Sequence, residues 1–516
     1  MKYDDGVTLS LWDATIKFPE FSSLEQNTSA EVCVVGAGIS GLTTAYLLAK
    51  EGKNVVLVDD GKVGYGQTHR TTAHLTCVID DRFYNIEKMH GEEGLKLATE
   101  SHANAIDLIE KIVAEEDIDC DFLRVPGYLF FPEESVDEAQ KEIDSARKAG
   151  LSPEIMKSPE IPQLTNGTCL KFDRQGQFHI GKYMIALSNA TIKAGVRIYT
   201  GTHIKSIEKN GENGVKLITS KDFIINCNST VIATNSPVSD LVRIHAKQAP
   251  YITYVISAII PKNSIPTALY WDSLDPYHYV RLQPMDDHDI LIIGGEDHKT
   301  GQADDIPQRY KNLEDWARLR FSQMKEIIYK WSGQVIEPID GLSYTGLDPE
   351  HKKNVYIITG DSGMGITHGT YSAVIIKDLI TGKYNEWAKL YDPSRVTLRA
   401  YKEFIRESAN MASQYIELIT GGEIKSYDDI IPGEGAVIKS GLKKIAVYKD
   451  HEGRLFGFNA LCTHLKCVVH WNNVEKTWDC PCHGSRFDAL GKVINGPAMN
   501  DLKRENIEDF ANHKTK

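Results

Sequence analysis

Two short boxes of cysteine and histidine near the end of the chain constrain its fold more than any other feature. The first box is Cys462-Thr-His464 and the second is Cys480-Pro-Cys482-His483, so each offers a thiolate and an imidazole. Fifteen residues separate the two boxes. Two loops must therefore fold back on each other if these side chains are to share one metal centre.

This ligand set has a specific chemical meaning. Two thiolates suit one iron and two neutral imidazoles suit the other, which is the mixed ligation of a Rieske [2Fe–2S] centre. The neutral imidazoles raise the reduction potential, to roughly −150 to +300 mV against about −400 mV for all-cysteine plant-type clusters. A structural zinc site of two cysteines and two histidines is the alternative that the ligand types leave open.

The segment from about residue 424 to 510 resembles a Rieske domain of the disulfide-bearing branch found in cytochrome bc complexes. The resemblance implies that Cys467 and Cys482 form a disulfide between the two loops. It also implies that Ser485 donates a hydrogen bond to a cluster sulfur and that Gly496-Pro497-Ala498 covers the cluster. The implied metal ligands are Cys462, His464, Cys480 and His483.

Two residues depart from that pattern. Phe487 stands where this branch usually has a tyrosine donor. Because losing a donor to sulfur makes reduction harder, the sequence predicts a potential below that of the respiratory proteins. Lys466 stands where the family commonly has glycine, which places a positive charge near the cluster mouth.

A glycine motif near the start of the chain predicts a dinucleotide site. Gly36-x-Gly38-x-x-Gly41 lies between an apolar strand and a helix, and a second strand ends at Asp59. In such a βαβ unit the pyrophosphate lies at the helix N-terminus and the acidic residue takes the ribose hydroxyls. A structural glycine turn is the alternative, and both FAD and NAD use such units. The predicted contacts here are Gly36, Ala37, Gly38, Ile39, Ser40, Gly41 and Asp59.

Segments at both ends of the first 382 residues favour FAD. The segment from Gly64 to His74, together with Asp340 to Gly346 and Gly360 to Gly369, resembles the D-amino-acid oxidase and glycine oxidase-like flavoproteins. The resemblance covers about residues 30 to 382, although the last glycine cluster alone would also fit an ordinary loop. It implies FAD contacts from Thr68, His69, Arg70, Thr71, Thr72, Ile204, Gly363, Met364, Gly365 and Thr367.

Two further residues carry functional hypotheses. Arg281 lies where this family often has an arginine that binds a substrate carboxylate, a task that suits a bidentate guanidinium. A surface arginine is the alternative. His69 lies near the position at which a few relatives attach FAD covalently, with a register one residue off.

These features predict an α/β FAD-binding domain of Rossmann-like, glutathione-reductase type, with an interleaved mixed-sheet substrate domain and a C-terminal all-β Rieske domain. The expected oxidoreductase spans residues 1–382, the helical connector 383–423 and the Rieske domain 424–516. Within the first, nucleotide-binding parts are expected at about 28–80, 180–240 and 335–382, and the substrate lobe at about 81–179 and 241–334.

The connector is expected to contain one long helix from Pro393 to Ile419. Its Lys, Arg and Glu residues are mixed in sign, which favours a solvated helix packed by its apolar side over one that touches a membrane and a quinone pool. The apolar residues expected to share that side are Tyr401, Phe404, Ile405, Ala409, Ala412, Ile416 and Ile419.

The domain order narrows the function. No second nucleotide motif is present, which argues against NAD(P)H, and a Rieske domain placed last and bearing the disulfide pair argues against a Rieske oxygenase. The architecture resembles the YhfW-like group of bacterial FAD-dependent oxidoreductases. We expect an amine or amino-acid dehydrogenase that passes electrons from reduced flavin through a Rieske [2Fe–2S] cluster to an external acceptor, a protein or a quinone. The alternative is an electron-transfer or redox-sensing protein without an amine substrate.

Composition excludes other classes. The net charge of −13 and the absence of a basic tract argue against nucleic acid as a partner. No apolar run approaches the ~18 residues of a membrane span, and the sequence begins without a secretory signal, so a cytoplasmic protein is expected. The remaining cysteines are predicted to be small buried hydrophobes: Cys33, Cys77, Cys120, Cys169 and Cys227.

Overall fold

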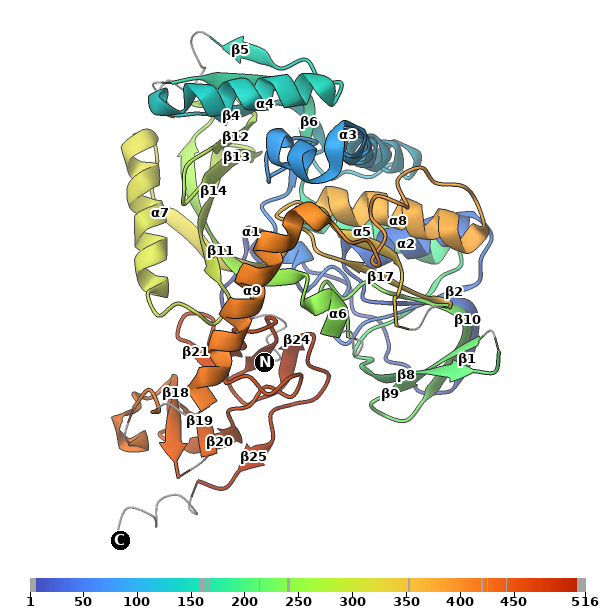
Figure 1. Cartoon of the computed structure of the whole chain (residues 1–516), viewed down its shortest axis with the longest axis vertical. Helices are drawn as coiled ribbons and strands as arrows, with labels where there is room; N and C mark the ends of the chain where they lie inside the picture. Colours follow the sequence, from blue (N-terminus) through green and yellow to red (C-terminus); the bar gives the residue numbers. More distant parts are fainter. Residues whose placement is uncertain are drawn as a thin grey trace.

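The computed structural model describes residues 6–507, apart from 157–163, 165–166, 213, 239–241, 351–352, 419–420, 425 and 442. Three parts follow one another along the chain (Figure 1): an N-terminal body to residue 382, a connector, and a C-terminal module from residue 423. The helix prediction for Ile419 lies outside the described residues.

The first sheet of the body has the parallel core of a nucleotide-binding fold. Its strands lie in the order β16, β17, β10, β1, β2 and β7, while β9 and β8 extend it from β10 as antiparallel neighbours. The last residues of β1 and all of β2 are buried apolar side chains, as expected for strands covered on both faces. The strand bounds are β1 Thr28–Val35, β2 Val55–Val58, β7 Arg197–Tyr199, β8 Ile204–Asn210, β9 Gly214–Thr219, β10 Ile224–Ile232, β16 Tyr344–Leu347 and β17 Val355–Thr359.

The second sheet of the body is mixed and mostly antiparallel. Its strands lie in the order β15, β11, β14, β13, β12, β4, β6 and β3, and β5 pairs with β6. The strand bounds are β3 His74–Leu75, β4 Leu123–Phe130, β5 Glu154–Met156, β6 Cys169–Gln177, β11 Gln248–Pro261, β12 Leu269–Asp272, β13 His278–Pro284, β14 His288–Lys299 and β15 Ile327–Pro338.

Helices cover both sheets and bridge the parts. Figure 1 shows α2, α5 and α8 beside the first sheet, α4 and α7 outside the second, and α9 running from the body to the C-terminal module. The helix bounds are α1 Leu11–Thr15, α2 Ile39–Lys50, α3 Phe83–Glu115, α4 Val136–Lys148, α5 Ile180–Lys193, α6 Val242–His245, α7 Ile306–Arg320, α8 Gly365–Thr381 and α9 Tyr401–Gln414. Short 3-10 helices are η1 Thr68–Arg70, η2 Glu133–Ser135, η4 Leu398–Ala400, η5 Tyr415–Leu418 and η6 Tyr427–Asp429.

The described part of the C-terminal module consists of small antiparallel sheets, as predicted. One has the order β18, β19, β20 and β25, and the other has the order β21, β22, β23 and β24. The strand bounds are β18 Glu434–Ser440, β19 Lys443–Lys449, β20 Leu455–Asn459, β21 His470–Asn472, β22 Thr477–Asp479, β23 Arg486–Asp488, β24 Val493–Asn495 and β25 Arg504–Glu505. The predicted fold class is therefore confirmed.

The connector helix packs differently from the prediction. In α9, Tyr401, Phe404, Ile405 and Ile416 of the adjoining turn are exposed, whereas Glu407 is buried. The predicted apolar side therefore faces outward. Among the described residues, no helix combines the length and the apolar character needed to cross a bilayer.

Candidate functional site

The glycine motif forms a tight turn against the first sheet. Gly36 has a φ of +103°, which only glycine adopts freely, and a Cβ there would lie 2.4 Å from the Ala233 carbonyl oxygen. A Cβ on Gly41 would lie 1.8 Å from the Gly36 oxygen, so this glycine lets α2 pack closely on the turn. Gly38, which precedes α2, has no side chain to cap the helix, and the N–H of Ile39 donates instead to the Thr68 hydroxyl at 3.0 Å. Gly38, Ile39 and Ser40 line a cavity at this end of the helix, where a pyrophosphate is predicted to bind.

Asp59 ends the second strand of the unit and fixes the turn. Its carboxylate accepts hydrogen bonds from the N–H of Ala37 at 2.6 Å and from the N–H of Gly61 at 2.7 Å. Asp59 also lines the cavity that begins at the glycine motif. A single carboxylate thus holds the loop and lines the cavity, and its contact with the ribose of a dinucleotide stays a prediction.

The cavity continues from the glycine motif to the second glycine cluster at α8. It brings together the following predicted FAD contacts: Gly36, Gly38, Ile39, Ser40, Asp59, Thr68, Arg70, Thr71, Thr72, Ile204, Gly363, Met364 and Gly365. Three other residues predicted to contact FAD do not line the cavity but contact residues of the same segments. Ala37 binds Asp59, Gly41 packs against the turn, and the Thr367 hydroxyl lies 2.8 Å from Nδ1 of His102.

His69 is not among the residues that line this cavity, so its contact with FAD stays a prediction. Its ring packs against Tyr65 at 4.5 Å, and its Nε2 lies 3.5 Å from the Asp13 carboxylate of α1. Burial holds the pKa of His69 well below its ordinary value. The side chains of η1 alternate in direction, so Thr68 and Arg70 line the cavity while His69 does not.

Arg281 is also placed differently from the prediction. Its side chain is fully buried, and its guanidinium donates to the carbonyl oxygens of Ala73 at 2.9 Å and Phe178 at 3.0 Å. It also donates to the Gln283 side chain and lies over the Trp12 ring. Arg281 is not among the residues that line the cavity, so the structure does not bring it to the predicted substrate site, and its role with a substrate carboxylate stays a prediction.

The cavity wall nearest the second sheet contains residues that the sequence interpretation missed. Trp271, Tyr277 and Tyr279 present aromatic rings to it, and Asp80 supplies a carboxylate. Tyr279 shares a 2.8 Å hydrogen bond with Thr253, and Tyr277 donates to Asp80. In the sequence, this wall could have been found only from Tyr279, because it lies two residues before Arg281 on the same strand and its side chain points to the same face.

Further carboxylates lie behind Asp80. The Ser362 hydroxyl lies 2.6 Å from Asp81 and 2.8 Å from Glu337. Because one hydroxyl carries one proton, the second of these contacts requires a proton on a carboxyl group. Burial raises the pKa of Asp81 to about 7 and that of Glu337 well above its ordinary value. These carboxyl groups therefore hold at least one proton, and burial also raises the pKa of Asp80 in front of them.

The Cys/His boxes meet in the C-terminal module as their spacing predicts. The Cys462 and Cys480 thiols are hydrogen-bonded to each other, while the His464 and His483 rings lie 4.9 Å apart. The hydrogen bond from Cys480, together with main-chain N–H donors, lowers the pKa of Cys462 to about 7 despite burial. The two sulfurs thus form one pair and the two imidazoles another, which fits one iron on each pair.

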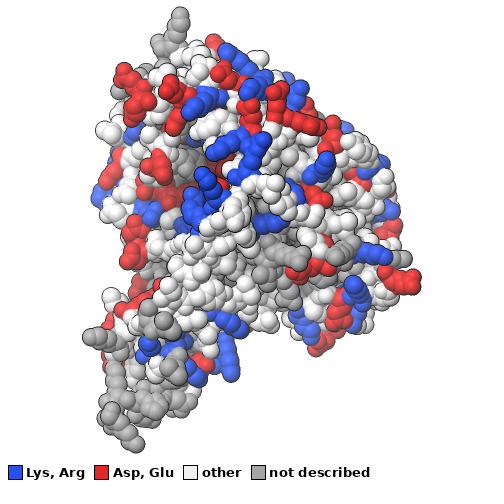
Figure 2. All heavy atoms as spheres, in the orientation of Figure 1, with Lys and Arg blue, Asp and Glu red and all other residues white. Residues whose placement is uncertain are grey.

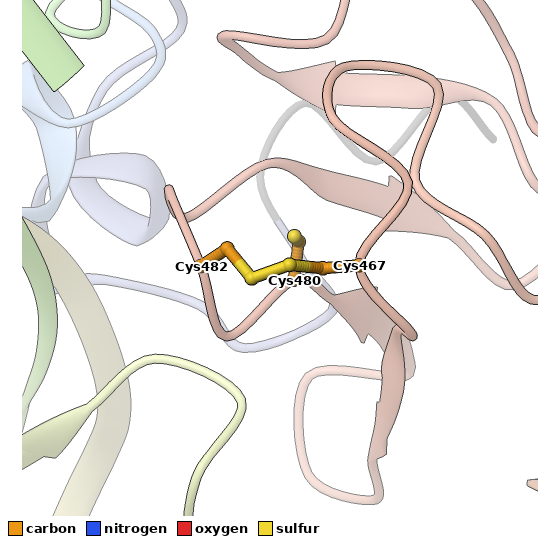
Figure 3. Close-up of side chains that lie close together, drawn as sticks. All are labelled: Cys467, Cys480 and Cys482. Carbon is orange, nitrogen blue, oxygen red and sulfur yellow. A yellow bond between two sulfur atoms is a disulfide. The ribbon is translucent and has the colours of Figure 1, made fainter. Parts of the chain in front are cut away.

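The predicted disulfide and its surroundings are also present. Cys467 and Cys482 are bonded, and Figure 3 shows Cys480 beside them. Ser485 accepts a hydrogen bond from the N–H of Ala498 at 3.0 Å and binds Cys462. This serine therefore links the covering loop to a cluster ligand.

Comparison with known families assigns both parts of the chain. The family described as FAD dependent oxidoreductase (DAO) matches residues 31–379, and the Rieske [2Fe-2S] domain matches residues 423–506. The chain belongs to the FAD-dependent oxidoreductase family. Its cofactors are FAD and a Rieske [2Fe–2S] cluster, which the glycine-lined cavity and the paired thiol and imidazole ligands fit.

Individual relatives agree with this assignment. The chain is 31% identical to the Rieske 2Fe-2S iron-sulfur protein YhfW of Bacillus subtilis, over 96% of this chain and 97% of that protein. The cytochrome b6-f complex iron-sulfur subunit of Thermosynechococcus vestitus is 46% identical over 13% of this chain and 39% of its own. Glycine oxidase from Geobacillus kaustophilus shares the fold of the body, with a TM-score of 0.60, 19% identity, and coverage of 71% of this chain and 99% of its own.

One departure in the Rieske domain gives a prediction about stability. Lys466 has a φ of +65° in the loop of the first box, a conformation that strains any residue except glycine. Replacing Lys466 by glycine is expected to stabilise the cluster-loaded protein by about 1 kcal/mol, measured by thermal unfolding followed at the cluster absorbance. A Lys466→Ala variant removes the same charge without relieving the backbone. An equal gain from alanine would contradict the assignment of the effect to backbone strain.

Proposed function

We propose that the protein is an amine dehydrogenase that passes electrons through its cluster to an external acceptor, a protein or a quinone. Bound FAD supplies hydride acceptance and one-electron release, and the bound cluster takes electrons singly. The chain must then bind an amine at the flavin and keep the two cofactor sites close together. The structure offers residues for both tasks.

The observation that carries this proposal is a shared wall. The FAD cavity is lined on one side by Asn495, the last residue of β24, and by Gly496 and Ala498 of the loop predicted to cover the cluster. Gln334 of β15 also lines the cavity, and its side chain bonds Asn495 and the carbonyl of Gly484, next to a cluster ligand. The two cofactor sites are therefore neighbours within one chain.

His245 of α6 strengthens the case for an internal electron path. Its buried ring lies 5.2 Å from the His464 ring and 5.9 Å from the His483 ring, measured between centroids. The body therefore covers the edge of the cluster site that bears the histidines. If the protein only transferred electrons to a partner protein, this edge would be expected to be open to that partner. The contact with His245 argues against that alternative.

The residues at the aromatic wall favour recognition of an ammonium group. Trp271, Tyr277 and Tyr279 offer ring faces, which attract cations, and Asp80 offers a carboxyl group whose pKa burial raises, so a bound ammonium group would favour its ionised form. Arg281, which would pair with a carboxylate, is held elsewhere. We therefore favour an amine over an α-amino acid as the substrate, with Asp80 as the residue that binds its nitrogen.

Anaerobic titration of the purified protein with amines and amino acids tests this proposal. A substrate amine is expected to bleach the flavin absorbance and to produce the paramagnetic signal of the reduced cluster together. If no member of a broad panel reduces either cofactor, while a protein extract rapidly oxidises a chemically reduced cluster, the electron-transfer alternative would replace this function.

Replacing Asp80 by asparagine tests the substrate site. Asparagine still accepts the Tyr277 hydrogen bond but loses the charge, so KM for a cationic amine is expected to rise about tenfold or more, since hydrogen bonds to charged groups are worth about 1.5–3 kcal/mol. The exposed Asp286→Asn variant is the control. An unchanged KM in the Asp80 variant would remove Asp80 from the binding site.

A further inference from the structure

The connector helix α9 presents its apolar side to solvent. Tyr401 is 64% exposed and Ile405 is 50% exposed, and Ala409 and Ala412 continue the row along the helix. Ile416, in the following turn, is 58% exposed. These residues recur at helical spacing, so they form one stripe rather than scattered surface positions.

The opposite side of the helix is held by polar contacts. Lys299 of β14 binds Glu407, which is buried, and Gln302 exchanges hydrogen bonds of 3.0 and 3.2 Å with Asn410. Before the helix, Trp387 and Tyr391 of the connector pack into the core of the body, and at its end Met411 and Tyr415 pack on the core of the Rieske domain. The exposed apolar residues of α9 therefore do not pack into the core of the body or of the Rieske domain.

The stripe continues before the helix begins. Leu398, in η4, is 83% exposed, and we call Leu398, Tyr401, Ile405 and Ile416 the α9 stripe. Contiguous exposed apolar surface of this kind is rare on soluble proteins unless it contacts a membrane or another molecule.

Basic side chains flank the α9 stripe. Arg399, Lys402 and Arg406 are exposed and lie three and four residues apart, on one side of the stripe. Figure 2 shows Lys and Arg side chains gathered around the upper end of α9, above a mostly uncharged surface along the helix. The segment from Leu398 to Leu418 also contains Glu403, Glu407 and Glu417, but Glu407 is buried on the opposite side, where it binds Lys299 and lies 3.5 Å from Arg406. The three basic residues are therefore the charges beside the stripe itself.

We propose that the α9 stripe lies on the surface of an anionic lipid bilayer. An amphipathic helix with an apolar face and flanking Lys and Arg residues binds the membrane interface by burying that face among lipid headgroups and attracting their negative charge. A symmetric second copy fits less well, because a two-fold axis would bring the basic residues of both copies together.

The α9 stripe lies close to a loop that binds the cluster. Just beyond α9, the Tyr415 hydroxyl donates a 2.8 Å hydrogen bond to the carbonyl of Leu465, in the loop that carries the ligand His464. The lipid-facing surface is thus continuous with one cluster-binding loop. An acceptor dissolved in the bilayer would meet the protein beside its cluster.

Sedimentation of the full, cofactor-loaded protein with vesicles tests the proposal. Vesicles of phosphatidylcholine with phosphatidylglycerol are expected to bind it, and pure phosphatidylcholine vesicles or high salt are expected to weaken the binding. Each basic residue replaced by glutamine among Arg399, Lys402 and Arg406 is expected to reduce the partition coefficient about fivefold. A Leu398→Glu/Ile405→Glu double variant is expected to abolish binding.

A matched control separates the stripe from general hydrophobicity. Leu319, at the end of α7, is 80% exposed and lies outside the stripe, so Leu319→Glu is expected to leave vesicle binding unchanged. Flavin and cluster absorbance confirm that each variant is folded. Equal loss of binding in the control, or no binding to anionic vesicles, would overturn the proposal. So would a self-association that Ile405→Glu abolishes without any lipid binding.

Discussion

Replacing Glu475 by alanine is expected to destabilise the joint between the Rieske domain and the body by about 3–5 kcal/mol, because it leaves a buried charge without its partner. The Glu475 carboxylate is 1% exposed and lies 3.1 Å from Nη1 of Arg70. It also accepts hydrogen bonds from the hydroxyls of Ser332 and Thr8, both at 2.5 Å. One carboxylate of the Rieske domain thus binds three residues of the body.

The effect is expected to reach the flavin site. Arg70 lines the FAD cavity, and it also donates a 2.8 Å hydrogen bond to the Ser332 carbonyl. Without Glu475 its guanidinium would lie in the joint as an uncompensated charge. We therefore expect the variant to release FAD at a lower temperature and to be cut between body and Rieske domain at lower protease concentration.

The control for this experiment is an exposed carboxylate in the same domain. Glu452 is 68% exposed and pairs with Arg454 on the surface, so Glu452→Ala is expected to change unfolding by less than about 1 kcal/mol. If the two variants unfold and are cleaved alike, the buried pair does not hold the joint together.

The pH dependence of the joint follows from the same carboxylate. Burial alone would raise the pKa of Glu475, but the charges of Arg70 and Arg486 and the hydroxyl donors lower it below its ordinary value of 4.5. A depressed carboxyl pKa contributes stability that is full above the unfolded value and is lost as pH falls through the folded value. The difference between wild type and the alanine variant is therefore expected to shrink as the pH falls below about 4.5.

The sequence predicted best where the chemistry is local. The glycine turn, Asp59 and the two Cys/His boxes each set their geometry within a few residues, and the structure brings them together as expected. The need for glycine at position 41 can be predicted from the motif alone, because a Cβ there would collide with the Gly36 oxygen of the same turn.

The sequence predicted least where remote segments decide a side chain's surroundings. Arg281 is buried because carbonyls from residues 73 and 178 converge on it, and no spacing along β13 reveals that. The outward direction of α9 depends on Lys299, which pairs with Glu407 across 108 positions of sequence. Periodicity shows that a helix has an apolar side, but not whether the fold covers that side.

Replacing Ser485 by alanine is expected to lower the reduction potential of the cluster by about 60–130 mV. Ser485 accepts from the N–H of Ala498, so its hydroxyl proton is free to be donated toward sulfur, as its contact with Cys462 indicates. A hydrogen bond to a charged group is worth about 1.5–3 kcal/mol. Since a tenfold change in a one-electron equilibrium corresponds to about 59 mV, losing a donor that favours the reduced state gives this shift.

Spectroelectrochemical titration of the cluster measures the shift, with Ser485→Thr as the control that keeps a hydroxyl. Phe487, two residues after Ser485, affects the reduction potential of the wild-type cluster. It is fully buried and has no hydroxyl, so it cannot supply the second hydrogen bond that a tyrosine would donate. We therefore expect the wild-type potential to lie below that of the respiratory proteins and the Ser485→Ala potential to lie lower still. A wild-type potential at or above the respiratory range would show that other donors replace the missing hydroxyl. An alanine variant that titrates like the threonine variant would show that Ser485 does not tune the cluster.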